Sequence, residues 1–173
     1  MKEEPIHFVI PGDPIVKKNT LKKSVFYRDK NNILRARVRP ITYYSQAYKQ
    51  WAKEAINSCM ILHNKLSAKG YQLPLDGTYI LKCIFYMSRN TVVDLSALYE
   101  GVQDVLTGNA GVYQNTVASR LYQIIADDSC RFIIGHDGSR VAYDYSNPRT
   151  EVTIIPVNLF EKVHTVSNSE NSF

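Results

Sequence analysis

The stretch VVDLSALYEGVQDVL contains three carboxylates whose spacing could support chemistry. Its apolar residues recur at three- and four-residue steps, which predicts an amphipathic helix over residues 94–107. Asp94 opens this helix, at a position where aspartate is a good N-cap. Ser96, Glu100 and Asp104 follow at i,i+4 steps and form a stripe opposite the apolar side. No Lys or Arg in the helix balances these charges, so the stripe is either a solvated face or part of a cation site.

A second acidic pair, Asp127 and Asp128, ends an apolar segment in the stretch ADDSCRF. There the two carboxylates either belong to a turn or point across a cleft toward the helix. Mg²⁺ prefers oxygen ligands, usually one or two carboxylates with water and phosphate in the other positions. An all-carboxylate cluster without His or Cys, combined with a basic segment, indicates metal-assisted hydrolysis of phosphodiesters.

The basic segment lies in the first quarter of the chain, whose overall net charge is +5. Residues 1–40 contain 10 Lys and Arg against 4 Asp and Glu, which is +6, and the remaining residues contain 11 against 12, which is −1. Phe26 and Tyr27 interrupt the cations, and Asn, Thr and Ser accompany them, a mixture that suits phosphate and sugar contacts. We expect residues 17–39 to form a mobile arm or a hairpin that turns near Asn31–Asn32, with a polyanion as its partner.

Strands and helices interleave irregularly around these groups, which predicts a single α+β domain over residues 1–157, with a mixed β-sheet flanked by helices. The expected strands are 6–10, 77–87, 149–157 and two that flank a turn at His136–Gly138. The polar tail, residues 158–173, is expected to be disordered.

Residues 43–67 have the apolar period of a long helix, with Ser45 as its N-cap and Gly70 after its end. Three aromatic residues on this helix are expected to pack in the core rather than to stack on bases: Tyr44, Tyr48 and Trp51.

Some classes of protein and site do not fit the sequence. No apolar run approaches the roughly 20 residues that span a bilayer, and the N-terminus has no signal-peptide pattern, so we expect a cytoplasmic protein without a membrane partner. Neither CxxC nor paired Cys and His is present, which argues against zinc. His136 is expected to be structural or exposed, with a DNA contact as the alternative. The three separated cysteines, each with apolar neighbours, are expected to be buried thiols: Cys59, Cys83 and Cys130.

Four segments, in order, resemble the RusA family of Holliday-junction resolvases from phages and prophages: IPGDPIVKKNT, YSQAYKQWAKEA, DLSALYEGVQDVLTG, and ADDS followed by PRTEVTI. The third resembles the family's acidic signature, Asp-x-Asp-Asn-Leu-x-Lys-x-x-x-Asp-x-Leu. The match covers most of residues 6–155. The resemblance implies a RusA-like fold and a homodimeric, Mg²⁺-dependent endodeoxyribonuclease that nicks symmetrically across four-way DNA junctions, with Mn²⁺ as a possible substitute ion.

Carried over by position, the resemblance implies roles for Asp94 and Asp104 as signature aspartates and for Asp128 as the second residue of the Asp-Asp pair. Two positions depart from the pattern: Ser96 replaces the second signature aspartate, and Glu100 replaces the lysine.

These departures lie one helical turn apart, so a carboxylate lost at Ser96 can be replaced from Glu100. We therefore expect the catalytic metal ligands to come from the carboxylates Asp94, Glu100, Asp104 and Asp128. The missing lysine would be supplied by Lys17 or, as the expected catalytic residue, Lys18.

The cations of the basic segment are the expected DNA contacts: Lys17, Lys18, Lys22, Lys23, Arg28, Arg35, Arg37 and Arg39. Arg140 and Arg149 are either further phosphate contacts or surface charges. Two other functions stay open, a non-catalytic protein that binds branched DNA and a nuclease with another structure specificity. No small-molecule cofactor is expected.

Overall fold

The computed structural model describes residues 4–16, 20–42, 45–110 and 117–157, and side chains are outside this description for 20–25, 37–42 and 117–118. Lys17, Lys18, Tyr44 and the predicted tail over 158–173 lie outside the described residues. Helices and a mixed sheet are combined in this chain, which confirms the predicted α+β class.

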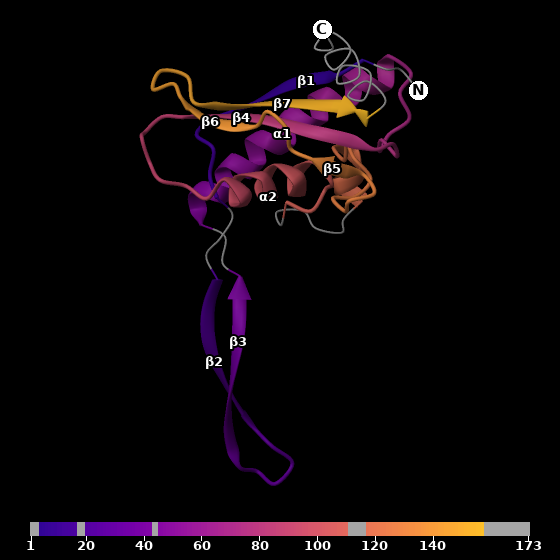
Figure 1. Cartoon of the computed structure of the whole chain (residues 1–173). Coiled ribbons are helices and arrows are strands. Elements are labelled where there is room, and N and C mark those ends of the chain that lie inside the picture. Colours follow the sequence, from indigo (N-terminus) through magenta and orange to yellow (C-terminus); the bar gives the residue numbers. More distant parts are fainter. Residues whose placement is uncertain (1–3, 17–19, 43–44, 111–116, 158–173) are drawn as a thin grey trace, which may run out of the picture.

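A mixed five-stranded sheet forms the body of the protein (Figure 1). Its strands are β1 (Ile6–Pro11), β4 (Tyr79–Met87), β5 (Ile133–Gly135), β6 (Arg140–Tyr143) and β7 (Arg149–Pro156). β7 lies between β1 and β4 and is antiparallel to both, whereas β5 and β6 run parallel to β4 along its other edge. The strands predicted at 6–10, 77–87 and 149–157 are confirmed.

The turn predicted at His136–Gly138 is confirmed, but the strands on either side of it do not pair with each other. Both continue along the same edge of β4, and Ser139 fills the gap between them. The Ser139 hydroxyl accepts a hydrogen bond from the Cys83 N–H at 2.8 Å. A side-chain oxygen thus takes the place of a strand carbonyl as acceptor, at the point where the turn leaves the edge of β4.

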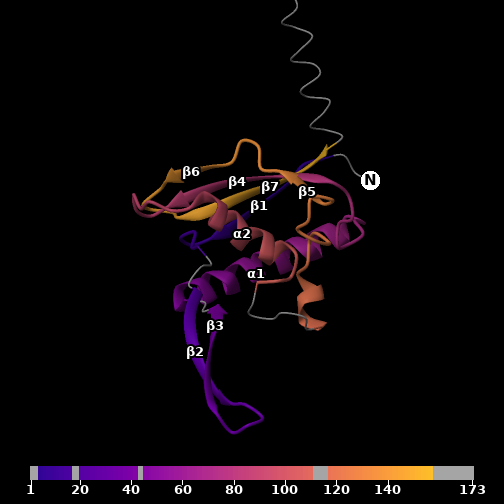
Figure 2. The ribbon, with the colours of Figure 1, turned by 60° about the horizontal axis from the view of Figure 1, so that its bottom comes forward.

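Both long helices cover one face of the sheet (Figures 1 and 2). α1 (Gln46–Ala68) begins at the predicted N-cap, Ser45, whose Oγ accepts from the Tyr48 N–H at 3.0 Å. α2 (Leu95–Leu106) follows β4, and a short 3-10 helix, η1 (Val117–Leu121), comes later. Within the described residues, no helix is long and apolar enough to cross a bilayer.

The core lies between the helices and the sheet. Leu81, Cys83 and Phe85 of β4 are fully buried and alternate with half-buried residues, as expected for a strand with one covered face. Tyr48 and Trp51 are buried, as predicted. Two of the predicted buried thiols are also confirmed, Cys59 and Cys83, and burial raises the pKa of Cys59 to about 12.

The prediction for Cys130 is wrong, because this cysteine is exposed. It lies in a turn closed by a hydrogen bond from the Phe132 N–H to the Ser129 carbonyl at 2.9 Å. A residue in such a surface turn does not face the core, whatever its sequence neighbours are.

The basic segment forms a separate two-stranded antiparallel sheet, made of β2 (Thr20–Arg28) and β3 (Leu34–Thr42). This β2–β3 hairpin extends away from the body (Figures 1 and 2). Its turn includes the predicted Asn31–Asn32 pair. Asn32 has a positive φ of 61°, which Asn tolerates better than most residues, and its N–H donates to the Asp29 carbonyl at 2.9 Å. The hairpin alternative of the sequence prediction is therefore confirmed.

We predict that two isoleucine substitutions on α1 differ sharply in their effect on stability. Ile56 is 4% exposed and Ile61 is 65% exposed. Ile56→Ala should lower the free energy of unfolding by about 2–5 kcal/mol because it leaves a cavity. Ile61→Ala, the matched control, should change it by less than about 0.5 kcal/mol. Urea unfolding followed by circular dichroism measures both, and equal losses would contradict this packing of α1.

Candidate functional site

Asp94 is the N-cap of α2, as its position in the sequence predicts. Its backbone is extended, with φ −77° and ψ 112°. Its Oδ1 accepts hydrogen bonds from the Ser96 N–H at 3.0 Å and from the Ser96 hydroxyl at 2.7 Å. Ser96, where the RusA family that the sequence resembles has an aspartate, therefore supports the cap directly. A carboxylate at position 96 could not donate this second hydrogen bond when ionised.

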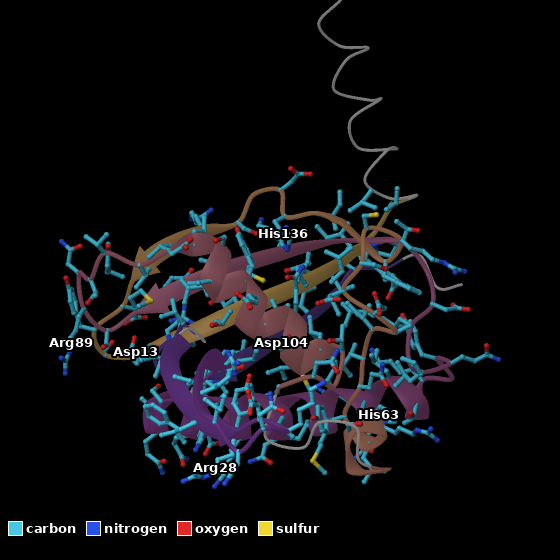
Figure 3. All side chains as sticks on the ribbon, turned by 90° about the horizontal axis from the view of Figure 1, so that it is seen from below. Asp13, Arg28, His63, Arg89, Asp104 and His136 are labelled. Atoms are coloured by element: carbon cyan, nitrogen blue, oxygen red, sulfur yellow. The ribbon has the colours of Figure 1, made fainter. Side chains whose placement is uncertain are left out.

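Asp13 lies in the loop that follows β1 and connects two segments far apart in the sequence. Its carboxylate accepts hydrogen bonds from the Ser88 N–H, at 2.9 Å, and from the Ser88 hydroxyl. This contact joins the segment before the hairpin to the loop between β4 and α2. Figure 3 shows Asp13 near Arg89 at one end of the body. In the sequence, Asp13 is only part of a Pro-Gly-Asp-Pro turn, which gives no signal of the contact.

The acidic stripe of α2 is not wholly opposite its apolar side. Ser96 is exposed, Glu100 is half-buried and Asp104 is only 7% exposed. The chain beyond α2 folds back against the end of the helix, next to Asp104. The Asn109 N–H donates to the Asp104 carbonyl at 2.6 Å. The Ile124 N–H donates to the carbonyl of Leu106, the last residue of α2, at 2.8 Å. The prediction that the stripe lies opposite the apolar side is correct for Ser96, in the first turn of the helix, and wrong for Asp104, in the last.

Asp127 and Asp128 lie in a loop beside the start of β4. The Leu75 N–H donates to the Ile124 carbonyl at 2.7 Å, and the Tyr79 N–H donates to the Phe132 carbonyl at 2.7 Å, so the loop is fixed on both sides. Asp127 accepts from the Ser129 N–H at 2.7 Å, and hydrogen bonds from Ser129 lower its pKa. Asp127 thus belongs to a turn, one of the two alternatives that the sequence left open. Asp128 is exposed.

The predicted metal ligands are spread along the body. Asp94 follows the end of β4 and Asp128 lies beside its start, and nine strand residues at about 3.3 Å each separate these ends by roughly 30 Å. Asp94 and Asp104 are ten helical residues apart, or about 15 Å along the axis. Mg²⁺ holds its ligands at about 2.1 Å, so one ion cannot bind all these carboxylates. Among the described residues, no group of three His, Cys, Asp or Glu side chains forms a metal site.

Glu100 and Asp104 are the predicted ligands that remain within reach of one ion in a single chain. Residues at i and i+4 of a helix have Cβ atoms about 5–6 Å apart. Two carboxylates at that distance match the number that Mg²⁺ often takes from a protein, with water and phosphate completing its shell. This pair meets the spacing that a shared ion requires, whereas the full set of four carboxylates does not.

His136 packs against α2, which supports its structural interpretation. Its ring centroid is 4.3 Å from that of Tyr99, and its Nε2 is 3.2 Å from Gln103 Nε2. Burial lowers the pKa of His136, against an opposing effect of Asp137, so the ring is neutral at pH 7. Tyr99 and Gln103 were not singled out in the sequence, because their only signal is their place on the helix.

Arg149 is a structural ion-pair residue rather than an open phosphate contact. Its guanidinium is 2.8 Å from an Asp144 oxygen and 2.7 Å from a Glu151 oxygen, and it stacks at 3.8 Å from the centre of the Tyr86 ring. The hydrogen bonds that Arg149 donates to Glu151 and Asp144 raise its pKa. Arg140 is exposed on β6.

Two of the predicted DNA contacts can be placed with their side chains. Arg35 forms an ion pair with Asp29 at 2.7 Å and keeps 57% of its side chain exposed, and Arg28 donates to the Asn32 carbonyl at 2.9 Å. The other cations that lie within the two hairpin strands are placed by their backbones alone: Lys22, Lys23, Arg37 and Arg39.

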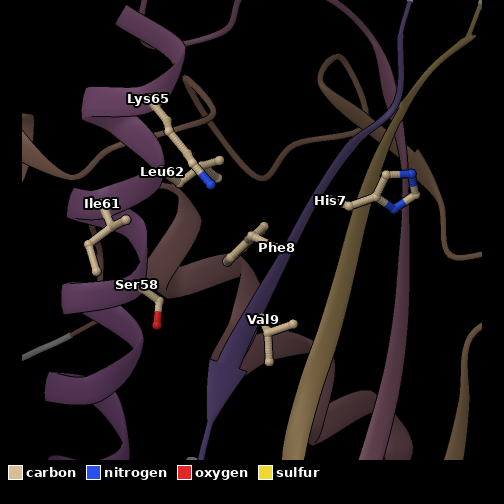
Figure 4. A pocket seen from close by; sticks show the side chains of 7 residues that line it. All are labelled: His7, Phe8, Val9, Ser58, Ile61, Leu62 and Lys65. Carbon is tan, nitrogen blue, oxygen red and sulfur yellow. The ribbon is translucent and has the colours of Figure 1, made fainter. Parts of the chain in front are cut away.

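A pocket of about 210 Å³ lies between β1 and α1 (Figure 4). Its lining residues are His7, Phe8, Val9, Ser58, Ile61, Leu62 and Lys65. None of the predicted metal ligands or DNA contacts lines it. The His7 ring instead bonds to the Thr153 hydroxyl at 2.9 Å, across the two neighbouring strands. The pocket is therefore separate from the carboxylates of α2.

A comparison of the chain with protein-family models and with curated proteins finds no match.

We predict that Asp94 stabilises α2 through the geometry of its cap. Asp94→Ala should lower the free energy of unfolding by about 1 kcal/mol, because it removes the acceptor of the Ser96 hydrogen bonds. Asp94→Asn keeps an acceptor oxygen and should cost only a few tenths of a kcal/mol. Chemical denaturation of the two variants measures the difference. A similar loss in both would show that the charge, and not the cap, stabilises the helix.

Proposed function

We propose that this protein binds DNA through the β2–β3 hairpin and that branched DNA is its target. One observation carries the proposal: a two-stranded ribbon extends from the body and carries the excess positive charge of the chain. Residues 20–42 contain 7 Lys and Arg against 1 Asp, which is +6, whereas the whole chain is +5. The rest of the protein therefore contributes no net attraction to a polyanion.

The shape of the ribbon supports a nucleic acid as the polyanion. Nine residues in each strand give a length of about 30 Å, close to the roughly 34 Å of one turn of B-DNA. A two-stranded β-ribbon also fits the width of the major groove. Lys and Arg along such a ribbon supply the phosphate contacts that dominate affinity. The preference for branched DNA, and the homodimer that would present two arms, rest on the resemblance to RusA resolvases.

We predict that the affinity for DNA falls steeply as the salt concentration rises. Removal of hairpin cations should make this dependence less steep. Arg37→Gln/Arg39→Gln should lower the slope of log affinity against log salt by about 2 and weaken junction binding at 0.15 M salt by more than about tenfold. Lys53→Gln/Lys65→Gln removes the same charge from exposed positions on α1 and serves as the control. Fluorescence anisotropy with a labelled four-way junction measures both. An unchanged slope in the hairpin variant would overturn the DNA-binding role of this segment.

A second candidate function is Mg²⁺-dependent, structure-specific hydrolysis of the bound DNA, with paired nicks across a four-way junction. Glu100 and the buried Asp104, on adjacent turns of α2, favour it. A bound Mg²⁺ would stabilise charge on a phosphate oxygen and supply an activated water. Glu100 and Asp104 would hold the ion, and the hairpin would hold the DNA.

We predict that Glu100→Gln separates cleavage from binding. Loss of the carboxylate should reduce Mg²⁺-dependent nicking of a synthetic four-way junction by more than about 100-fold, a typical loss for a group that acts on the reacting centre. Affinity measured without Mg²⁺ should stay within about twofold, since Glu100 lies outside the hairpin. Glu54→Gln, at an exposed acid of α1, is the matched control.

Nicking by Glu100→Gln at the unaltered rate would remove Glu100 from the site. If the unaltered protein binds the junction but does not nick it with Mg²⁺ or Mn²⁺, the non-catalytic alternative holds. Flap and linear duplex substrates at the same salt concentration distinguish a junction resolvase from a nuclease of other specificity.

A further inference from the structure

The β2–β3 hairpin has two chemically different faces. Residues directly opposite each other in an antiparallel pair share a face, and the faces alternate along each strand. Phe26 is opposite Ala36, and Arg28 is opposite Leu34, so these four residues belong to one face. The next register pairs belong to the other face: Tyr27 with Arg35, Val25 with Arg37, and Lys23 with Arg39. One face, the basic face, thus carries four of the six strand cations, and the other, the apolar face, carries Phe26, Leu34 and Ala36 beside Lys22 and Arg28.

The apolar face is exposed. Phe26 is 66% exposed and Leu34 is 61% exposed, and the neighbouring Ile33 in the turn is 53% exposed. Aromatic and branched side chains that remain in water forgo about 25 cal/mol for each Å² that they could bury. An isolated two-stranded hairpin is also only marginally stable in water. These residues therefore favour a ligand that covers them.

The turn holds these apolar side chains in place. Asp29 Oδ1 accepts from the N–H groups of Asn31 at 2.9 Å and Ile33 at 3.1 Å, and the other oxygen pairs with Arg35. The hydrogen bond from Arg35 lowers the pKa of Asp29, so the pair is ionised at neutral pH. The outer end of the hairpin is thus a built structure that can present Phe26 and Leu34 together.

Charge decides which ligand covers this face. A second copy of the hairpin would place one net charge of +6 against another, and the two would repel each other. DNA can bind to both faces. Phosphates neutralise the basic face, and bases offer apolar surface to the other. Apolar side chains inserted between base steps unstack them at a cost of a few kcal/mol, and this cost is least where pairing or stacking is already interrupted. A branch point is such a place.

Building on the proposed DNA binding, we infer that the hairpin recognises the branch itself. Phe26 and Leu34 contact unstacked bases at the branch point, while the face that carries Tyr27 and Arg35 follows the phosphates. The basic face then gives affinity for any DNA, and the apolar face gives the preference for branched DNA. This assigns structure recognition to the hairpin rather than to the carboxylates of α2.

The test compares a four-way junction, with 2-aminopurine at its branch point, to a linear duplex of the same length. Phe26→Ala should weaken junction binding by about tenfold, within the range measured for base stacking on aromatic residues, and leave duplex binding within about twofold. The increase in 2-aminopurine fluorescence on binding should also be lost. Phe26→Trp should restore both. Leu34→Ala should have a smaller effect in the same direction, and Ile61→Ala on α1 should have none.

The outcomes separate this inference from the proposed function. Absence of DNA binding by the unaltered protein at 50 mM salt would overturn the proposed function itself. DNA binding with equal junction affinity and fluorescence in Phe26→Ala would overturn only the role of the apolar face. Unchanged DNA binding together with conversion of a dimer to a monomer, by analytical ultracentrifugation, would show that a second copy covers Phe26. Circular dichroism verifies that each variant is folded.

Discussion

The pairing of β4 on both edges is the constraint on which the rest of the body depends. β7 bonds to one edge, and β5 and β6 bond to the other, so β4 cannot shift without breaking the whole sheet. α2 starts beyond the end of this strand and finishes near its beginning, where the loop before Ile125 bonds to the helix end. This path places Asp94 at one end of the body and Asp128 at the other. The separation of the predicted ligands is thus a consequence of the sheet.

The first turn of α2 is locally consistent, although the carboxylates expected as metal ligands do not gather around one ion. Ser96 gives Asp94 two hydrogen bonds, and the result is a well-formed cap. Glu100 places a carboxylate one turn before Asp104, where both can face one ion. A chain with this arrangement keeps the acidic order that resembles the RusA signature while moving the negative charge along the helix. The proposed catalytic pair is therefore smaller than the set implied by the resemblance, and it lies away from the Asp94 cap.

The hairpin combines features that are unfavourable in the absence of a ligand. The register places Lys23 opposite Arg39, and like charges in that position destabilise a strand pair. Both strands also leave an edge unpaired in the two-stranded sheet. The Asp29 hydrogen bonds offset part of this cost at the turn. A polyanion along the basic face would remove the repulsion, so binding and ordering of the hairpin are coupled in the proposed function.

The sequence by itself determined the two long helices with their caps and three strands of the body, to within a few residues at their ends. The caps Ser45 and Asp94, the strand at Tyr79–Met87 and the turn at Asn31–Asn32 depend on interactions among residues a few positions apart. Only the tertiary structure decided that Asp104 is buried, that Asp13 bonds to Ser88, that Arg149 is held by two carboxylates, and that Cys130 faces water. A helical or strand period shows which residues share a face, but it does not show which distant segment covers that face. For the carboxylate stripe of α2, tertiary packing leaves Glu100 half-buried and buries Asp104.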